Sequence, residues 1–453
     1  MHRSIPAGLV LALAAPLAAL AQTNPEVESL RKEIDSIRAS YEQRLQALEQ
    51  RLTAAEAAAR QTPPAAPAPS SATAAAATPA APGGAAGGAN AFNPAVSLIL
   101  SGTYGRTTRN PDTYSLTGFA LPPGGDVGPV GRGFSLNESE LGLAANIDPW
   151  LSGAANIALH PNDTVSVEEA YVQTTSLGHG LSLKAGRFFS GIGYLNSQHS
   201  HTWDFVDNPL AYQAFLGTQF GDDGLQLHWL APTDLFLEAG AEIGRGRGFP
   251  GSDTARNGAG ATALYAHAGG DLGDSSSWRA GLSVLSAKST GQDLVSTDPL
   301  GINATRAFSG RSRVWIADAV WKWAPNGNAT RTNFKLQGEV LRSTRDGQLA
   351  DASVAALPLG SSQNGWYLQG IYQFMPHWRV GARTERLDSG SASALAAATY
   401  RPSKNSLMFD YSPSEFSRVR LQLARDLSRF GQPDNQLYVQ YQMSLGAHGA
   451  HSY

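Results

Sequence analysis

Two histidines and two aspartates lie close together in the segment 189–222, and residues of these types can bind a metal ion. His199 and His201 are separated by one residue, so on an extended backbone both imidazoles point to the same side. Asp204 and Asp207 follow a few residues later. Imidazole nitrogens and a carboxylate suit Zn²⁺, which gives a hypothetical site of His199, His201 and Asp204. Histidine pairs are common in loops, so a structural or pore-lining role is the alternative that we favour.

A catalytic role is not expected. A His–Asp pair can act as a base and its orienting partner, but no serine-elbow motif accompanies the pair in this sequence. We therefore expect that the chain is not an enzyme and has no cofactor, with Zn²⁺ as the single candidate ion.

A second set of charged residues alternates with apolar residues, and we expect it to line an aqueous lumen. The acidic members are Glu138, Glu140, Glu169, Glu238, Glu242, Asp318, Glu339 and Glu385, and the basic members are Lys184, Lys322, Lys335, Arg379, Arg383, Arg418 and Arg420. The acidic residues concentrate in the N-terminal half and the basic ones in the C-terminal half, which predicts opposite charges across the lumen. The alternative is that local pairs cancel.

The segment 189–222 carries more apolar side chains than a freely solvated loop would. These are Tyr194, Leu195, Trp203, Phe205, Val206 and Leu210. We expect the segment to fold inward and narrow the lumen, as the third loop of porins does by analogy. Its polar residues and Trp203 would then lie at the constriction.

The elements that must position these residues are strands. From residue 92 to the C-terminus the sequence alternates with period two, as in 437–445. Seven short turns are predicted at 147–150, 176–180, 231–234, 273–277, 324–328, 375–377 and 412–415, and eight mostly longer connections at 105–133, 161–164, 189–222, 245–260, 289–310, 344–363, 388–404 and 427–435. These 15 connections separate sixteen strands, an even number as in single-chain bacterial barrels, although 394–400 could be an additional strand.

Tryptophan placement favours a membrane barrel over a soluble β-sandwich. Trp150, Trp229, Trp278, Trp321, Trp323 and Trp378 all lie near a predicted short turn. An aromatic girdle at the periplasmic interface has this distribution. The terminal Tyr453 is in phase with the outward residues of the last strand, which is typical of outer-membrane proteins.

The N-terminal region differs from the barrel in composition. Residues 1–21 have the basic start, the short apolar run and the Ala-Leu-Ala end of a cleaved signal peptide. Residues 22–60 contain a narrow apolar seam at spacings of three and four, which predicts a periplasmic coiled coil, and 61–91 form a Pro/Ala/Gly linker. The barrel is expected over 92–453. With no cysteine and a net charge of -3, the chain is stabilised without disulfides and is not suited to nucleic acid.

Several segments resemble a family of proteobacterial outer-membrane proteins. They begin at Phe92 (FNPAVSLIL), Gly186 (GRFFSGIGYLN), Trp229 (WLAPTDLF), Trp321 (WKWAPNGN) and Tyr411 (YSPSEFSR). Relatives are labelled porins or zinc-regulated TonB-dependent receptors, and the preceding coiled coil is similar to that of trimeric substrate-specific porins such as the phosphate-selective ones. A TonB-dependent receptor contains a globular plug in a 22-stranded barrel. About 360 barrel residues preceded by a helix and a linker do not fit that description.

Three functional hypotheses remain. The first is a trimeric outer-membrane porin for small hydrophilic solutes, the second a zinc-linked uptake protein, and the third a barrel anchor whose coiled coil tethers the cell wall. The expected partners are outer-membrane lipid, lipopolysaccharide, the assembly machinery, further copies of the chain and, for the third hypothesis, peptidoglycan.

Overall fold

The computed structural model describes residues 94–124, 127–252, 257–298, 300–351, 354–391 and 399–446. The predicted signal peptide, coiled coil and linker lie outside these residues, and so do Tyr453 and most of 394–400.

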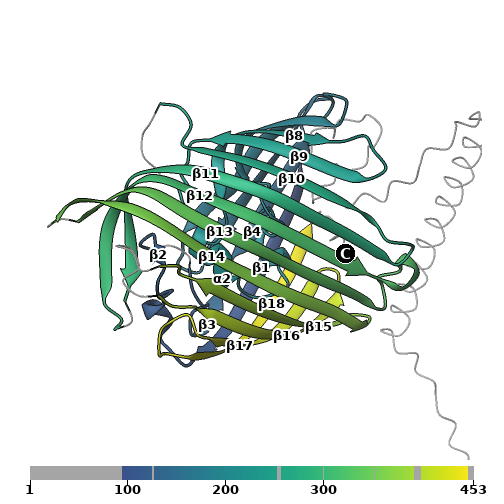
Figure 1. Cartoon of the computed structure of the whole chain (residues 1–453). Coiled ribbons are helices and arrows are strands. Elements are labelled where there is room, and N and C mark those ends of the chain that lie inside the picture. The colour runs from purple at the N-terminus through teal and green to yellow at the C-terminus, as the bar shows by residue number, and fades with distance from the viewer. Residues whose placement is uncertain are drawn as a thin grey trace, which may run out of the picture. The chain divides into compact units, whose positions relative to one another are not determined.

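Sixteen antiparallel strands of the described residues form a closed barrel (Figure 1). They are β1 (Ala95–Thr107), β4 (Ser139–Asn146), β5 (Leu151–Leu159), β6 (Val165–Thr174), β7 (Leu181–Phe189), β8 (Gly221–Leu230), β9 (Phe236–Gly244), β10 (Ala261–Asp271), β11 (Ser276–Thr297), β12 (Asn303–Trp323), β13 (Asn333–Asp351), β14 (Val354–Met375), β15 (Trp378–Asp388), β16 (Ser403–Ser414), β17 (Ser417–Asp426) and β18 (Asp434–Gly446). The barrel closes because β1 pairs with both β18 and β4. Two shorter strands are additions to this wall: β3 (Gly133–Leu136) pairs with β1, and β2 (Ala120–Leu121) with β11. The sixteen-stranded barrel predicted from the sequence is confirmed.

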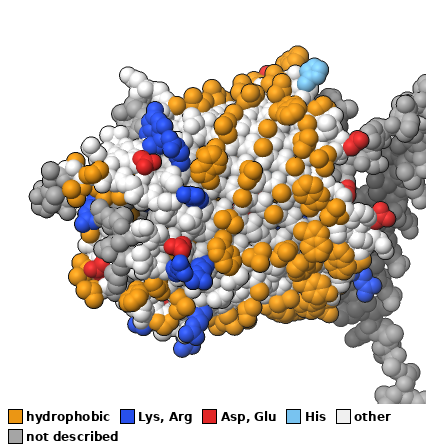
Figure 2. Space-filling model, viewed as in Figure 1, with side chains coloured by type: hydrophobic (Ala, Val, Ile, Leu, Met, Phe, Trp, Pro, Cys, Tyr) orange, Lys and Arg blue, Asp and Glu red, His pale blue; other side chains and the backbone are white. Residues whose placement is uncertain are grey.

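The two faces of the wall differ in the way that the alternation predicts. On β18, Val439 and Tyr441 are 39% and 47% exposed, whereas Gln440 and Gln442 are 4% and 6% exposed. Apolar side chains therefore face outward and polar ones inward, the reverse of a soluble barrel. Figure 2 shows the resulting cover of hydrophobic side chains on the wall.

All seven predicted short turns join adjacent strands, although the turn predicted at 324–328 is longer, extends to residue 332 and contains η3 (Pro325–Gly327). The loops predicted at 289–310 and 344–363 are wrong in extent. Here β11 to β14 are 19 to 22 residues long and continue through most of both segments. In these segments Leu294, Phe308, Leu349 and Leu359 are buried in one cluster. Outward positions such as Ser309, Asp346 and Gln348 are polar, so the usual outward-apolar alternation is lost while the strands stay paired.

The third outer loop, residues 190–220 and named L3 below, folds into the barrel. It contains η2 (Ser200–Thr202) and α2 (Leu210–Leu216), which ends at Gly217 with φ 65°. Every residue of α2 is buried, and the helix packs against β13, β14 and β15. No helix of the described ranges is long and apolar enough to cross a membrane.

The wall beneath α2 is apolar, whereas the sequence predicts a polar lining. The inward-facing Val314, Ile316, Leu341 and Leu387 are 0% to 2% exposed and belong to the same core cluster as α2. The outer part of this wall is therefore a packing surface for L3, and only the rest of the lining is polar.

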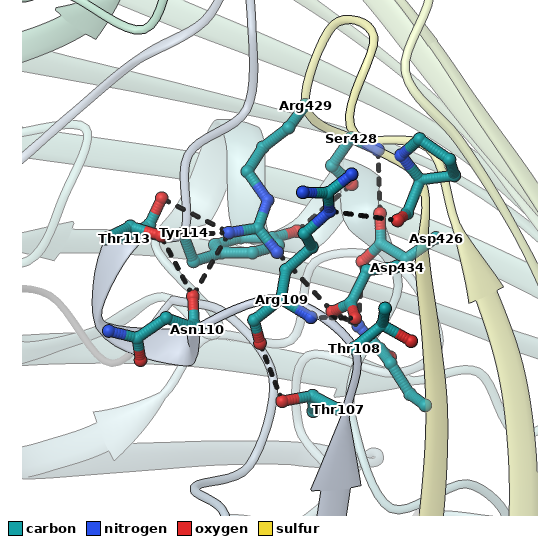
Figure 3. A network of polar contacts seen from close by, with 12 residues as sticks. Thr107, Thr108, Arg109, Asn110, Thr113, Tyr114, Asp426, Ser428, Arg429 and Asp434 are labelled. Carbon is teal, nitrogen blue, oxygen red and sulfur yellow. Dashed lines mark hydrogen bonds and ion pairs between the residues drawn. The ribbon is translucent and has the colours of Figure 1, made fainter.

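The first and last outer loops are joined by hydrogen bonds (Figure 3), and the first loop also contacts L3. Arg429 of the last loop donates hydrogen bonds to the Asn110 carbonyl (3.1 Å) and to Thr113 Oγ1 (3.1 Å) of the first. In the first loop, the hydroxyl of Tyr114 lies 3.3 Å from Gln213 Oε1 in α2. The Phe119 ring, from the same loop, lies 5.8 Å from that of Phe215. L3 is thus covered on its outer side.

Candidate functional site

A cluster of carboxylates on β4 and β6 surrounds the first histidine of L3. His199 Nδ1 lies 3.2 Å from both Glu140 Oε2 and Glu168 Oε2, and His199 Nε2 lies 2.9 Å from Glu169 Oε2. His201 Nδ1 lies 3.1 Å from the same Glu140 oxygen. We call Glu138, Glu140, Glu168 and Glu169 the acidic wall; its remaining member, Glu138, accepts a short hydrogen bond from Ser200 Oγ.

Glu168 was not among the predicted lumen residues, because a β-bulge on β6 interrupts the alternation there. Asn156 of β5 is opposite Glu169, but the next residue, Ile157, is opposite Val167, so Glu168 is an extra residue on β6. A bulge breaks the strict alternation of side chains. Both Glu168 and Glu169 therefore reach His199, whereas a period of two places only Glu169 inside.

The surroundings of His199 favour its positively charged form. Burial alone would lower its pKa, but the hydrogen bonds to Glu140, Glu168 and Glu169 outweigh burial and raise the pKa of His199 well above the ordinary value. A charged imidazolium can donate from both ring nitrogens, as this arrangement requires. His199 thus ties L3 electrostatically to the acidic wall.

The same cluster contains a candidate metal set that differs from the predicted one. Glu140, Glu168 and His199 each place one donor atom within 4.8 Å of the donor atoms of the other two. A nitrogen and carboxylate oxygens suit Zn²⁺, which would replace the proton on the imidazole. Asp204 does not join the histidines as predicted, because its carboxylate lies against Lys335 and Arg379.

Asp204 and Asp207 instead contact basic residues of β13, β15 and β16. We call these residues, together with two arginines of the neighbouring β17, the basic wall: Lys335, Arg379, Arg383, Lys404, Arg418 and Arg420. Asp204 Oδ2 lies 2.5 Å from Lys335 Nζ, and Asp204 Oδ1 lies 3.4 Å from Arg379 Nη1. Asp207 accepts from Arg383 Nη2 (2.7 Å) and forms an ion pair with Lys404. Lys404 was not among the predicted lumen residues because it falls at the end of a predicted loop.

These ion pairs shift the titration of both aspartates. Burial would raise their pKa values, but Lys335 and Arg379 lower the pKa of Asp204 far below its ordinary value. Lys404 and Arg383 do the same for Asp207. Both carboxylates are therefore ionised over the whole physiological range.

Main-chain atoms of L3 are also held by the wall. Arg418 donates to the His201 carbonyl (2.8 Å) and Arg420 to the Trp203 carbonyl (2.8 Å). Three glutamates accept from backbone N–H groups: Glu339 from Leu195 (3.0 Å), Glu385 from Leu210 (2.6 Å) and Glu242 from Gly191 (2.9 Å). L3 is thus fixed at many points on both sides of the lumen.

Of the predicted lumen residues, Glu238, Asp318, Lys184 and Lys322 are not in these anchors. Glu238 lies between His228 and His267, with oxygen–nitrogen distances of 2.8 and 3.2 Å. The Asp318 carboxylate lies 3.9 Å from His267 Nε2. Lys184 Nζ lies 4.4 Å from the centre of the Tyr171 ring, and Lys322 is opposite Lys335 on β13.

Charged side chains of L3 partly neutralise the charge separation that was expected across the lumen. Histidines of L3 lie against the acidic wall and aspartates against the basic wall, so much of the charge is compensated locally. This is the alternative in which pairs cancel, with the compensating charges supplied by the loop.

No family model matches the chain. It is similar in structure to the trimer form of OmpT, an outer membrane protein of Vibrio cholerae, with 12% identity, 78% of this chain and 99% of that chain covered, and a TM-score of 0.46. It is also similar to OprB of Pseudomonas putida, with 13% identity, 78% and 94% covered and a TM-score of 0.49. An anion-selective porin from Comamonas acidovorans gives 11% identity, 78% and 100% covered and a TM-score of 0.49.

A closer similarity in sequence exists to a protein of Aquifex aeolicus (strain VF5) that is described as an uncharacterized protein. The two are 30% identical over 390 residues, which cover 80% of this chain and 80% of the relative. The chain therefore belongs to the same family as this Aquifex aeolicus protein.

Proposed function

We propose that the chain is a porin-type channel of the Gram-negative outer membrane, through which small hydrophilic solutes pass, and that L3 controls the opening. The observation that carries the proposal is the position of L3, which is joined by ion pairs and hydrogen bonds to both the acidic and the basic wall. An apolar outer face and a polar inner face support the membrane location.

The side chains that remain partly exposed inside the barrel indicate where solute meets the channel. The Lys335 and Arg379 side chains are 23% and 18% exposed, and both residues lie within two residues of the short-turn end of their strands. Both also contact Asp204. A solute that passes L3 would therefore meet two cations that share the loop carboxylate Asp204, of which Arg379 also pairs with Asp410 of β16.

Planar-bilayer conductance tests this function. The full chain should conduct, and D204N/D207N should conduct more, because four cations of the basic wall then lose their partners in L3. D274N, in the exposed turn between β10 and β11, is the matched control and should behave as the wild type. A folded wild-type protein without conductance contradicts the proposal, and an unchanged D204N/D207N contradicts the role of L3.

We further propose that the barrel assembles as a trimer through the side formed by its short strands. β4 to β9 have 8 to 10 residues, whereas β11 to β14 have 19 to 22. Outward positions on β4 and β5 include the small residues Ala145, Gly153 and Ala155, which permit close approach of another barrel. Native mass spectrometry should give three copies, and a monomer would contradict this.

A second candidate function is metal-linked uptake, favoured by the donor set of Glu140, Glu168 and His199. Calorimetry with Zn²⁺ should give binding that E168Q weakens and that E242Q, which removes an L3 anchor outside the set, leaves unchanged. Equal affinity of wild type and E168Q would remove this candidate.

A further inference from the structure

Four cations gather on the outward face of β11, β12 and β13. Lys288 and Arg311 are directly opposite each other on neighbouring strands, and Arg313 is the next outward residue along β12. Arg342 of β13 is opposite Trp315, so it is a diagonal neighbour of Arg313. All four side chains are exposed. We call these four residues the basic patch.

Like charges that face each other across a strand pair destabilise a sheet unless a counter-ion is present. The carboxylate nearest in register is Asp346, opposite Arg311. No ion pair joins Arg311, Arg313 or Arg342 to a carboxylate of the described ranges. The three arginines, with Asp346 as the nearest carboxylate in register, therefore carry an excess of positive charge that an external anion would stabilise.

The patch lies at one edge of the apolar band. Trp315 is opposite Arg342, and Trp366 of β14 is opposite Arg386 of β15, so these two outward arginines each have an exposed tryptophan beside them. Interfacial tryptophans mark the boundary of the hydrocarbon region. Along β14 the outward residues from Trp366 to Phe374 cover nine positions, close to the about 9–11 residues that a membrane strand needs.

The cations are confined to the loop side of this boundary. From Trp315 toward the short turns, the outward positions of β12 are Ala317, Ala319, Trp321 and Trp323. On the loop side, Arg425 of β17 extends the row begun by Arg342 and Arg386. In Figure 2 most Lys and Arg side chains accordingly gather on the left of the apolar band, where β11 to β14 extend beyond it in Figure 1. Short turns face the periplasm in such barrels, so this side is the outer leaflet.

We infer that the basic patch binds the phosphate groups of lipopolysaccharide in the outer leaflet. This inference rests on the outer-membrane location proposed above, but it does not depend on conduction. Arginine forks bind phosphate oxygens bidentately, and the apolar side chains next to the patch would contact the acyl chains of the same molecule. The continuation of β11 beyond Lys288 for nine residues, to Thr297, would lie in the sugar layer.

Binding of bisphosphorylated lipid A to the detergent-solubilised full chain tests the inference. R313Q and R342Q should each weaken the affinity about fivefold, since a basic residue near an anionic lipid surface contributes about that factor. R331Q, in the exposed turn before β13, removes one charge from the other end of the barrel and should have no effect. R342K should retain most of the affinity, and dephosphorylated lipid A should bind much more weakly.

Three results would overturn the inference: equal binding of the dephosphorylated lipid, equal binding of phosphatidylglycerol, or an equal loss in R331Q. Heat-modifiable mobility in gels establishes that each variant is folded. Conductance of the same preparations separates the two proposals. A protein that binds lipid A but does not conduct would support the basic patch and contradict the channel function.

Discussion

The attachment of L3 to the basic wall can be tested by removing one carboxylate. Asp207 accepts hydrogen bonds from Arg383 Nη2 (2.7 Å) and Gln422 Nε2 (3.0 Å) and forms an ion pair with Lys404, all of them buried. In D207N both cations lose their partner in L3, and only the wall carboxylates remain, Glu385 for Arg383 (2.8 Å) and Asp426 for Lys404 (3.9 Å). Removing one member of a buried ion pair costs about 3–5 kcal/mol. We expect this loss to appear as detachment of L3, because Arg383 and Lys404 are rehydrated when the loop leaves the wall.

Cysteine labelling measures this detachment, since the chain has no native cysteine. Ala214 lies in α2 and is 1% exposed, so A214C should react with a thiol reagent only when L3 has left the wall. A cost of about 3 kcal/mol corresponds to an open fraction roughly a hundred times larger, and labelling of A214C/D207N should accelerate by about that factor.

The control is A214C/D274N, which carries the same chemical change in an exposed turn and should label at the rate of A214C. Equal labelling of A214C and A214C/D207N would refute the reasoning, because Asp207 would then contribute nothing to the position of L3.

Four further outcomes follow from the same contacts. The pKa of His199 is raised, so its ion pairs with the acidic wall are fully formed below the ordinary histidine pKa and are lost as pH rises through the raised pKa. Labelling of A214C should therefore become faster at alkaline pH, and H199A should abolish that increase. The pKa of Asp207 is lowered, so its ion pairs with the basic wall are fully formed above the ordinary aspartate pKa and are lost as pH falls through the lowered pKa. Labelling of A214C should therefore stay slow in mild acid and become faster only in strong acid, and D207N should lack this acid-dependent increase. F215A removes a ring that is 0% exposed and should cost about 3–5 kcal/mol of packing, seen as faster labelling with an unchanged barrel in circular dichroism. E168Q should lower the pH at which the His199 tie is lost, because one of the carboxylates that raise its pKa becomes neutral.

The barrel itself could be predicted because its signals are local and repeated. Outward residues such as Val439 and Tyr441 alternate with inward ones such as Gln440, and short turns recur beside tryptophans. The inward direction of L3 was also predictable, since Trp203 and Phe205 are too apolar for a solvated loop. Both proved to be buried.

The partners of L3 could not be predicted, because they depend on contacts between distant segments. Asp207 meets Lys404 across 197 positions of the chain. Glu168 was missed because a bulge alters the alternation by one residue. The apolar inward positions at Val314 and Leu341 follow the same alternation as polar ones, and only the packing of α2 explains them.

The central claim is that movement of L3 controls passage through the barrel, and a reversible lock on L3 tests it most directly. A Cβ added at Gly365 of β14 would lie 3.1 Å from the Cβ of Ala211 in α2, near the span of a disulfide. A211C/G365C should conduct less after oxidation and recover after reduction, whereas each single variant should not respond. A folded, oxidised A211C/G365C that conducts as well as its reduced form would contradict the claim.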